Sequence, residues 1–251
     1  MAKMNPFEGL EISNDWQALF NINERQPCRK CSKSRKYFCY TCYTLNDDVE
    51  NKIPMLELPF KIDIIKHSRE IAGKSTAIHA ALLAPNDVTI YIYPDMPRYT
   101  EDDKVILVYP GKSAVTLQDF FSSSNRQEDS KEYNKQKTSS KFITHALFID
   151  STWNQSNGIL KDPIIRGLPC IKLQIRLSQF WRHQKGSPRW FLATIEAIHQ
   201  LLVEFTETDV ETNGPPKNYD NMLFFFRFMY EKIHQLYEHD QLKSYRRPMN
   251  V

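Results

Sequence analysis

The stretch FIDSTWNQSN, residues 148–157, marks an abrupt change from apolar to polar side chains. It closes the strand-like run FITHALFID (142–150), and Asp150 begins a series of hydroxyl, amide and indole groups that includes Trp153. Two interpretations fit these residues. Asp150 or Ser151 can cap a helix that Trp153 begins, or the carboxylate can act as a general base where the strand ends. The stretch by itself leaves both open.

Segments of strand and helix character alternate on either side of this stretch. Runs of β-branched and aromatic residues predict four further strands, at 58–67, 88–94, 104–110 and 170–177. Apolar residues at helical spacing predict helices at 75–85, 116–121, 189–205 and 222–239. Alternation of this kind is typical of an α/β fold with a mostly parallel sheet and helices on both faces.

Polar side chains gather where the predicted strands end. The strand ends concerned are Lys66-His67, Tyr93-Pro94, Tyr109-Pro110-Gly111, Asp150 to Trp153 and Leu177 to Lys185. In open parallel sheets, ligands bind beyond the carboxyl ends of the strands, so we expect a binding site at this edge. Gly111 either lets a ligand approach the backbone or forms an ordinary turn. Arg182, His183 and Lys185 either contact phosphates and bases or form an exposed basic loop.

Four cysteines lie in two CxxC pairs between residues 28 and 42, in CRKCSKSRKYFCYTC. Two such turns present four thiolates to one ion, which predicts a closed, structural zinc site formed by Cys28, Cys31, Cys39 and Cys42. Disulfides are the competing interpretation, but they do not suit a chain without a secretory signal. The interleaved basic residues either contact RNA or form a solvated loop: Arg29, Lys30, Lys33, Arg35 and Lys36. Cys170 stands apart and is expected to be a small buried residue.

Composition places the chain among ordinary globular proteins, with 41% hydrophobic and 25% charged residues. The net charge of +3 is too small to identify a partner. No apolar run approaches the roughly 18 residues that a membrane span needs, and the start MAKMNPFEGLEISND lacks the apolar core of a signal peptide. We expect a soluble, intracellular protein without a membrane partner, in the nucleus and/or the cytoplasm, with the nucleus favoured.

The chain divides into segments of different texture. Residues 1–24 are expected to be irregular, apart from a short helix near Trp16 to Phe20, and residues 25–50 to form the zinc module. Residues 54–245 form the main domain, in which the polar segment 121–141 is predicted to be a disordered insertion. Glu196, alone among apolar residues, is expected to face solvent or to complete a helix cap. GxSxG, P-loop and GxGxxG motifs are absent, which argues against covalent hydrolases, NTPases and dinucleotide enzymes.

The order of these motifs resembles that of the DTW-domain family of tRNA-uridine aminocarboxypropyltransferases. Asp150, Thr152 and Trp153 supply the Asp-x-Thr-Trp signature, and the four-cysteine cluster precedes it. Further motifs follow in the same order as in the family: His67 with Glu70, the YPG at 109–111, and Thr-x-Glu-Ala at 194–197. The resemblance spans residues 28–230. We assign no function to the polar stretch between YPGKS and the DTW strand.

The resemblance implies a SPOUT-like domain with a C-terminal trefoil knot around S-adenosylmethionine. It implies transfer of the 3-amino-3-carboxypropyl group from this cofactor to N3 of a tRNA uridine, in the D-loop, with release of 5′-methylthioadenosine. Asp150 then acts as the base that removes the N3 proton. An RNA methyltransferase on the same scaffold and a non-catalytic zinc-containing RNA-binding protein are the alternatives. Neither the tRNA species nor the oligomeric state follows from the sequence.

Two groups of contact residues follow from the resemblance. The expected cofactor contacts are Tyr109, Pro110, Gly111, Ser151, Thr152, Trp153, Leu177, Ser178, Thr194 and Glu196. The expected tRNA contacts are Arg29, Lys30, Lys33, Arg35, Lys36, His67, Arg182, His183 and Lys185.

Overall fold

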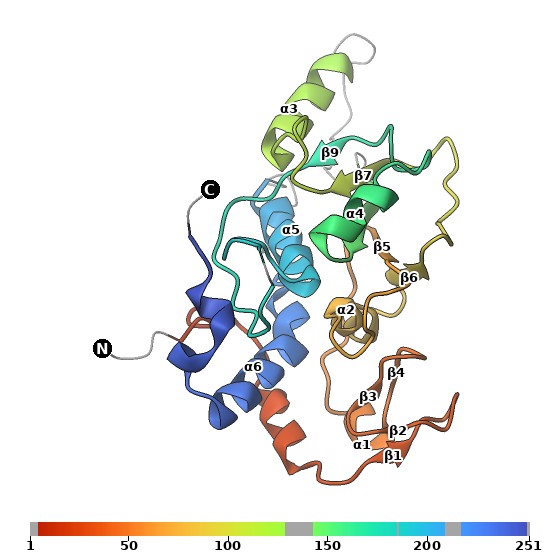
Figure 1. The fold of residues 1–251 in the computed structure, drawn as a ribbon. Helices are drawn as coiled ribbons and strands as arrows, with labels where there is room; N and C mark the ends of the chain where they lie inside the picture. The colour runs from red at the N-terminus through yellow and green to blue at the C-terminus, as the bar shows by residue number, and fades with distance from the viewer. Residues whose placement is uncertain (1–4, 129–142, 185, 209–216, 250–251) are drawn as a thin grey trace.

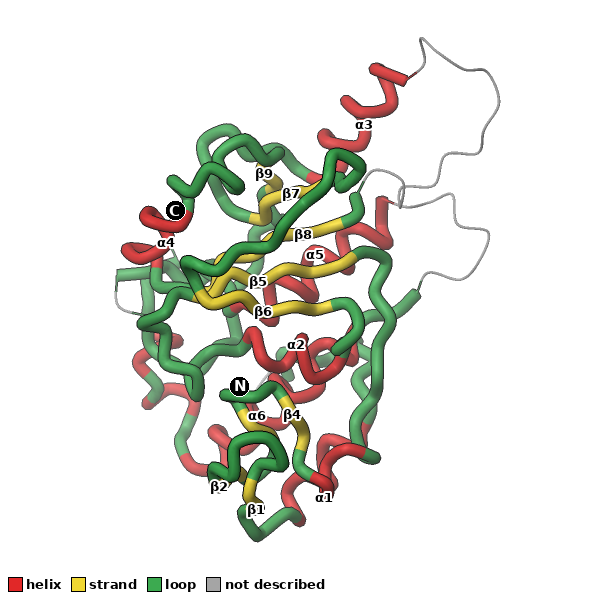
Figure 2. Tube along the Cα trace, turned by 90° about the vertical axis from the view of Figure 1, so that its right-hand side faces the viewer, coloured by secondary structure: helices red, strands yellow, loops and turns green. Residues whose placement is uncertain are grey.

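A five-stranded parallel sheet forms the centre of the computed structural model, which describes residues 5–128, 143–184, 186–208 and 217–249 (Figure 1). The strands lie in the order β6-β5-β8-β7-β9, and every pairing between them is parallel (Figure 2). Their bounds are β5 Lys61–Lys66, β6 Val88–Ile92, β7 Val105–Val108, β8 His145–Asp150 and β9 Cys170–Ile171. The α/β class and the parallel sheet predicted from the sequence are confirmed.

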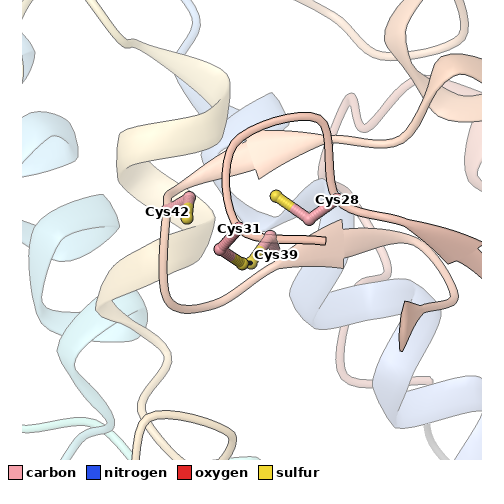
Figure 3. A group of neighbouring side chains, drawn as sticks. All are labelled: Cys28, Cys31, Cys39 and Cys42. Atoms are coloured by element: carbon pink, nitrogen blue, oxygen red, sulfur yellow. Dashed lines mark hydrogen bonds between the residues drawn. The ribbon is translucent and has the colours of Figure 1, made fainter. Parts of the chain in front are cut away.

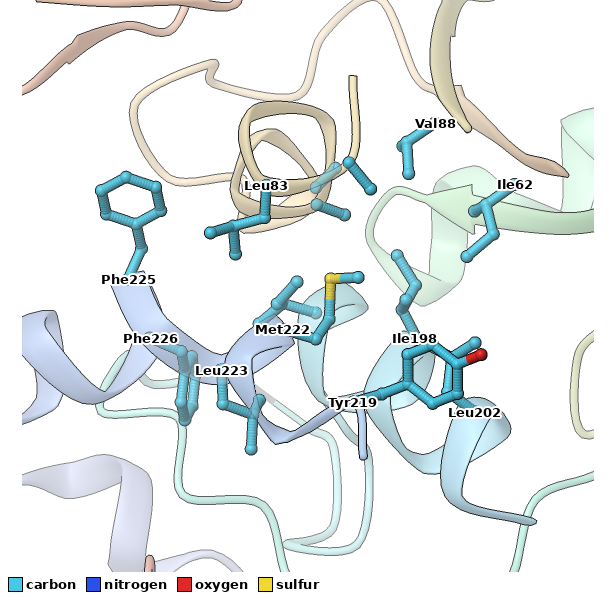
Figure 4. Close-up of a cluster of buried hydrophobic side chains, with 14 of the residues drawn as sticks. Ile62, Leu83, Val88, Ile198, Leu202, Tyr219, Met222, Leu223, Phe225 and Phe226 are labelled. Atoms are coloured by element: carbon cyan, nitrogen blue, oxygen red, sulfur yellow. The ribbon is translucent and has the colours of Figure 1, made fainter. Parts of the chain in front are cut away.

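Different helices cover the two faces of this sheet, because successive strand residues point to opposite faces. Ile62 packs in the larger apolar cluster with Ile198 and Leu202, which Figure 4 shows together. Ile65 packs on the other face with Ile159. The larger cluster includes α2 Ala77–Leu83, α5 Thr194–Thr208, η3 Asp220–Leu223 and α6 Phe224–Leu236; the smaller one includes α4 Trp153–Ile159. Helices therefore lie on both faces, as expected.

Two strands differ from their predicted form. The predicted strand 170–177 is reduced to β9, because the chain then leaves the sheet and Gln174 N donates a hydrogen bond to Glu204 Oε1 at 2.7 Å. The strand predicted at 88–94 is β6, which lies at the edge of the sheet and leaves Ile92 39% exposed. Because β6 pairs with one strand only, β5, it is less buried than its β-branched and aromatic composition suggests.

The helix predicted at 116–121 is longer than expected. It forms α3, Leu117–Glu128, and Phe121 is buried against Phe205 of α5. Residues 121–128 of the segment predicted to be disordered continue this helix. The rest of that segment, residues 129–141, lies outside the described residues.

The N-terminal segment contributes to the main core. It contains the predicted short helix as the 3-10 helix η1, Asn14–Asn21, and its apolar side chains are buried: Phe7, Ile12, Trp16, Leu19 and Ile22. The ring of Phe7 lies 5.2 Å from that of Tyr230, and Phe20 lies 5.1 Å from Phe228. Polar residues dominate this segment in sequence, but its few apolar residues pack into the core that α6 shares.

The four-cysteine segment forms two small antiparallel hairpins beside α2 and α6 (Figure 1). Their elements are β1 Gln26–Pro27, β2 Ser34–Arg35, β3 Phe38–Cys39, β4 Thr44–Leu45 and α1 Asp47–Glu50. The chain ends in two 3-10 helices, η4 His239–Gln241 and η5 Lys243–Arg246. Within the described residues, no helix is long and apolar enough to cross a membrane.

Candidate active site and four-cysteine centre

The carboxyl ends of β5 and β8 lie side by side and carry the charged residues that the sequence singles out. Lys66 pairs with Asp150 in the parallel register, and His67 N donates a hydrogen bond to Asp150 O at 3.1 Å. Lys66 and Asp150 are each 6% exposed. This edge is where ligands bind in open parallel sheets.

Both oxygens of the Asp150 carboxylate accept a hydrogen bond from a hydroxyl group. Ser75 Oγ donates to Oδ2 and Thr194 Oγ1 donates to Oδ1, each at 2.6 Å. Thr194 is the first residue of α5, and Ser75 precedes α2 and also accepts a hydrogen bond from Ala77 N. Short O–H···O⁻ bonds of this length are strong, so the strand end, α2 and α5 hold this carboxylate in one orientation.

Further charged groups surround Asp150. Burial raises the pKa of Glu70, and the Asp150 carboxylate raises it further, while Lys66, Lys74 and Arg182 oppose this shift. Burial also raises the pKa of Tyr43, and Asp150 again adds to the effect. Tyr43 directly follows the last cysteine of the cluster, so the cysteine hairpins reach the neighbourhood of Asp150.

Asp150 does not cap the helix that follows it. The N-cap of α4 is Thr152, whose backbone N–H donates to Gln155 Oε1 at 3.1 Å, and Ser151 Oγ donates to Thr152 O. The interpretation of Asp150 or Ser151 as the cap is therefore wrong. Because Thr152 performs this role, the Asp150 carboxylate is available to face Ser75 and Thr194.

Aromatic rings line the start of α4. The ring of Trp153 contacts those of Tyr109 and Phe191, with centroids 5.5 and 4.0 Å away, and Trp190 contacts Phe191 at 4.4 Å. Tyr109 Oη and Ser156 Oγ share a hydrogen bond of 3.1 Å, which ties the end of β7 to α4. The indole of Trp153, three residues after Asp150, is only half-buried, so this aromatic cluster is partly accessible from outside.

The YPG turn after β7 is closed by its own backbone. Gly111 N donates to Tyr109 O at 2.8 Å, which favours the ordinary turn over the alternative of a backbone N–H that meets a ligand. Cys170 Sγ also donates to Tyr109 O at 3.0 Å, and burial raises the pKa of this half-buried thiol. A Cβ at Gly111 would lie 3.4 Å from Cys170 Sγ, so the turn packs closely on this thiol.

Glu196 is fully buried and joins two segments. Its Oε2 accepts hydrogen bonds from Ser178 Oγ at 2.6 Å and Ala193 N at 2.8 Å, and its Oε1 accepts one from Gln179 N at 2.7 Å. The capping alternative is thus correct and the solvent-facing one is wrong. Burial raises the pKa of Glu196, although the bonds from Ser178 and from the two backbone amides oppose this. Ser178 is itself 0% exposed, whereas Leu177 is 43% exposed.

The four cysteine sulfurs converge on one point (Figure 3). All lie within 4.8 Å of one another, and Cys31 Sγ is 3.6 Å from Cys39 Sγ. The two CxxC turns repeat one geometry: Ser32 N donates to Cys28 O and Tyr43 N donates to Cys39 O, each at 2.8 Å, and both donor residues have φ near 55°. A tetrahedral ion with bonds of about 2.3 Å to sulfur needs sulfurs about 3.8 Å apart, so this donor set fits zinc.

The pKa values of two of these thiols shift in opposite directions. Hydrogen bonds from Thr44 and Lys30 N lower the pKa of Cys28 to about 6. The hydrogen bond with Cys31, together with burial, raises the pKa of Cys42 to about 12. No disulfide joins these cysteines, so the disulfide alternative finds no support in the structure.

The predicted RNA contacts fall into two groups. Arg35, Lys36 and Arg182 line a cavity between the cysteine hairpins and the sheet domain. The others lie outside it: Arg29 pairs with Asp47 and Glu50, Lys30, Lys33 and His183 are exposed, and His67 Nδ1 accepts a hydrogen bond from Arg69 N. Lys185 lies outside the described residues.

A family model for the DTW domain matches residues 36–234. The chain belongs to the DTW-domain family. Curated relatives of this DTW-domain chain are named tRNA-uridine aminocarboxypropyltransferase 1. The Xenopus tropicalis protein is 41% identical over an alignment of 257 positions, gaps included. The alignment covers 91% of this chain and 86% of the frog protein. The human protein is 41% identical over 235 residues, which cover 83% of this chain and 77% of the human one. No solved structure matches.

Several residues of the DTW-domain site escaped the sequence analysis. Ser75 donates a hydrogen bond to the signature residue Asp150, and Phe191 contacts the ring of Trp153. Trp190 in turn contacts Phe191. Ser75 opens the run STAIHAALLAP as an expected helix start, and Phe191 falls in a segment predicted to be helical. No spacing rule in the sequence connects these positions to Asp150.

Proposed function

We propose that this protein transfers the 3-amino-3-carboxypropyl group of S-adenosylmethionine to N3 of a uridine in the D-loop of tRNA and releases 5′-methylthioadenosine. The observation that carries the proposal is the placement of Asp150, a nearly buried carboxylate at the ligand-binding edge of the sheet with an orienting hydroxyl on each oxygen. The names of the relatives describe aminocarboxypropyl transfer to tRNA uridine for those proteins.

Asp150 acts in this proposal as the base. Uridine N3 carries a proton that has to leave as the nitrogen forms its new bond to carbon, and a positioned carboxylate typically contributes about 10²–10⁴-fold. Each carboxylate oxygen has a second lone pair beyond the one used by Ser75 or Thr194, so Asp150 keeps acceptor capacity for this proton. The cofactor, when bound, supplies the electrophilic carbon, and the carbon–sulfur bond breaks with its electron pair going to sulfur.

The aromatic group suits the cofactor. The half-buried Trp153, in ring contact with Tyr109 and Phe191, offers a partly exposed aromatic surface for an adenine ring. Trp190 Nε1 is buried without a hydrogen-bond partner among the described residues, so a donor is available for a bound polar group. Glu196 and Ser178 bond to each other, and we assign them to shaping the 177–179 turn rather than to direct contact.

We further propose that the cysteine cluster holds a structural zinc ion and that the sheet domain is of the SPOUT type with a C-terminal trefoil knot. The donor set of four thiolates supports the first part. The parallel five-stranded sheet is in keeping with a SPOUT-type domain, and the knot is proposed from the family resemblance. An experimental structure with an unknotted backbone, in which the C-terminal segment does not pass through a loop of the chain, would contradict the knot.

Mass spectrometry of nucleosides tests the proposed reaction. We expect that unmodified tRNA incubated with the protein and S-adenosylmethionine gains about 101 Da on a uridine, and that Asp150→Asn lowers the rate about 10²–10⁴-fold. Asp119→Asn is the matched control, because Asp119 is exposed on α3 and its carboxylate accepts a hydrogen bond from Thr116, away from the end of β8. A gain of about 14 Da would indicate methyl transfer instead, and RNA binding without any mass gain would indicate a non-catalytic binding protein.

A further inference from the structure

A cavity of about 360 Å³ lies between the cysteine hairpins, the loop before α2, residues 180–182 and α6. Its lining contains six basic residues and no acidic one: Arg25, Arg35, Lys36, Lys74, Arg182 and Lys232. Aromatic rings form much of the remaining wall, among them Tyr40 and Trp181. A cavity of this size accommodates one small ligand, and the lining predicts that the ligand is anionic and has a planar part.

Two nearly buried side chains in this lining carry nitrogen atoms without a hydrogen-bond partner among the described residues. Arg35 is 9% exposed, stacks on Tyr40 with its guanidinium 3.9 Å from the ring centroid, and donates to the neutral oxygens of Ser34 and Thr41, while its Nε has no partner. His79 is 4% exposed and its Nδ1 has no partner. Buried polar groups are normally paired, so both nitrogens indicate a ligand that completes the site.

The cavity shares a wall with the candidate active site. Ser75 lines the cavity, and its Oγ is the donor to Asp150 Oδ2 at 2.6 Å. Arg182, another lining residue, donates from Nη2 to Gly73 O at 3.2 Å and so links residues 180–182 to the loop that carries Ser75. A ligand in the cavity therefore lies next to the proposed reaction site without occupying it.

We infer that this cavity binds one nucleotide of the RNA substrate, with its phosphate on the basic side chains and its base against Tyr40 and Trp181. The inference rests on the proposed function, because it takes the substrate to be RNA. Arginine suits phosphate through its planar fork of donors, and aromatic rings stack on bases regardless of sequence. The site adds to recognition of the strand next to the uridine that reacts.

A charge-reversal pair tests the phosphate contact. Lys74→Glu changes an exposed lysine of the lining, and Lys161→Glu makes the same change at an exposed lysine beyond α4 that does not line the cavity. We expect Lys74→Glu to weaken binding of a tRNA transcript about tenfold or more. The slope of log affinity against log salt concentration should fall by about one, as for the loss of one phosphate contact. Lys161→Glu is expected to change binding less than about twofold. Equal effects of the two variants would overturn the inference.

His79→Phe tests the buried wall of the cavity. The substitution removes an unpaired buried nitrogen and keeps a ring in contact with Phe38 and Phe225, so thermal stability should stay equal or rise. If a nucleotide completes the site, tRNA affinity nevertheless falls several-fold. Unchanged tRNA affinity in a folded His79→Phe protein would contradict the inference. If His79→Phe does not fold, the comparison of Lys74→Glu with Lys161→Glu decides.

The outcomes separate this inference from the proposed function. If the wild-type protein transfers the aminocarboxypropyl group but Lys74→Glu and His79→Phe bind tRNA like wild type, the inference fails and the function stands. If both variants lose tRNA affinity while no transfer is detected with any tRNA, the nucleotide site stands and the proposed reaction fails. Binding of S-adenosylmethionine alone should be the same in wild type and Lys74→Glu. A loss there would assign the cavity to the cofactor and overturn the inference.

Discussion

Asp150 is fixed from two sides by hydroxyl groups that belong to different parts of the chain. Ser75 precedes α2 and Thr194 begins α5, and each donates a bond of 2.6 Å to one carboxylate oxygen. A base is effective only when its lone pair points at the proton it removes. The two hydroxyls therefore act as positioning groups for Asp150, and their removal should affect the chemical step more than substrate binding.

We expect Ser75→Ala and Thr194→Val each to lower kcat about tenfold and to change KM little, because the carboxylate loses one orienting bond but stays in place. Steady-state kinetics on tRNA measures both values. Thr206→Val, on the same helix as Thr194, is the matched control, since the Thr206 hydroxyl donates to Val203 O within that helix. A fall in kcat of equal size in Thr206→Val, or a change confined to KM, would show that these hydroxyls do not position the base.

Glu196 shows how much a single residue depends on its surroundings. As a lone carboxylate among apolar neighbours it fits either a solvated or a capping role, and only the approach of residues 178–179 to the start of α5 decides between them. Three donors converge on this one side chain. The contacts that decide the matter come from 17 and 18 residues away in the chain, beyond the reach of helical periodicity.

At the scale of elements, one carboxylate joins three segments. Asp220 in η3 accepts a hydrogen bond from Glu11 N at 2.9 Å through Oδ2, and its Oδ1 lies 2.8 Å from His199 Nε2 on α5. Burial would raise the pKa of Asp220, but the bonds from His199 and from Glu11 N outweigh it and lower the pKa below its usual value. The charged form of Asp220 thus holds the N-terminal segment on the core.

Because the folded-state pKa of Asp220 is lowered, its contribution to stability is present above the unfolded-state pKa and disappears as the pH falls through the folded-state value. We expect Asp220→Asn to reduce the free energy of unfolding by about 1–3 kcal/mol at neutral pH, with the difference from wild type shrinking under acid conditions. Urea unfolding at several pH values measures this. Asp240→Asn, at a fully exposed side chain, is the control. A destabilisation that does not depend on pH would contradict the role of the charge.

At the scale of the whole molecule, the cysteine hairpins and the sheet domain share one core. The ring of Tyr37 lies 5.0 Å from Phe228 and that of Phe38 lies 5.2 Å from Phe225, so residues of the hairpins pack directly on α6. Figure 1 shows the hairpins beside both α2 and α6. Loss of the cysteine cluster would therefore expose apolar surface of the sheet domain as well as unfolding the hairpins.

We expect one zinc ion per chain, and we expect Cys31→Ser or a strong chelator to lower the thermal unfolding midpoint and the tRNA affinity together, because the metal organises the hairpins. Metal analysis and thermal unfolding measure the two effects. Cys170→Ser, at the cysteine outside the cluster, should keep the metal. A metal-free protein with unchanged unfolding would contradict a structural zinc site.

The sequence alone determined the features that depend on local pattern. Alternating apolar residues located the strands, helical spacing located α2, α5 and α6, and paired CxxC turns located the cluster, because each signal repeats within a few residues. The position of Asp150 at a strand end followed in the same way. The packing of the N-terminal segment and the length of α3 were not recognised, since their few apolar residues form no periodic pattern without the surface they pack on.

Only the tertiary structure decided which side chains meet. Ser75 lies 75 residues from Asp150 and Thr194 lies 44 residues away, and the parallel sheet brings both helix starts to the end of β8. The nucleotide cavity likewise combines the hairpins, the loop before α2, residues 180–182 and α6. Contacts between such distant segments depend on how whole elements pack, and no short-range rule of sequence encodes that packing.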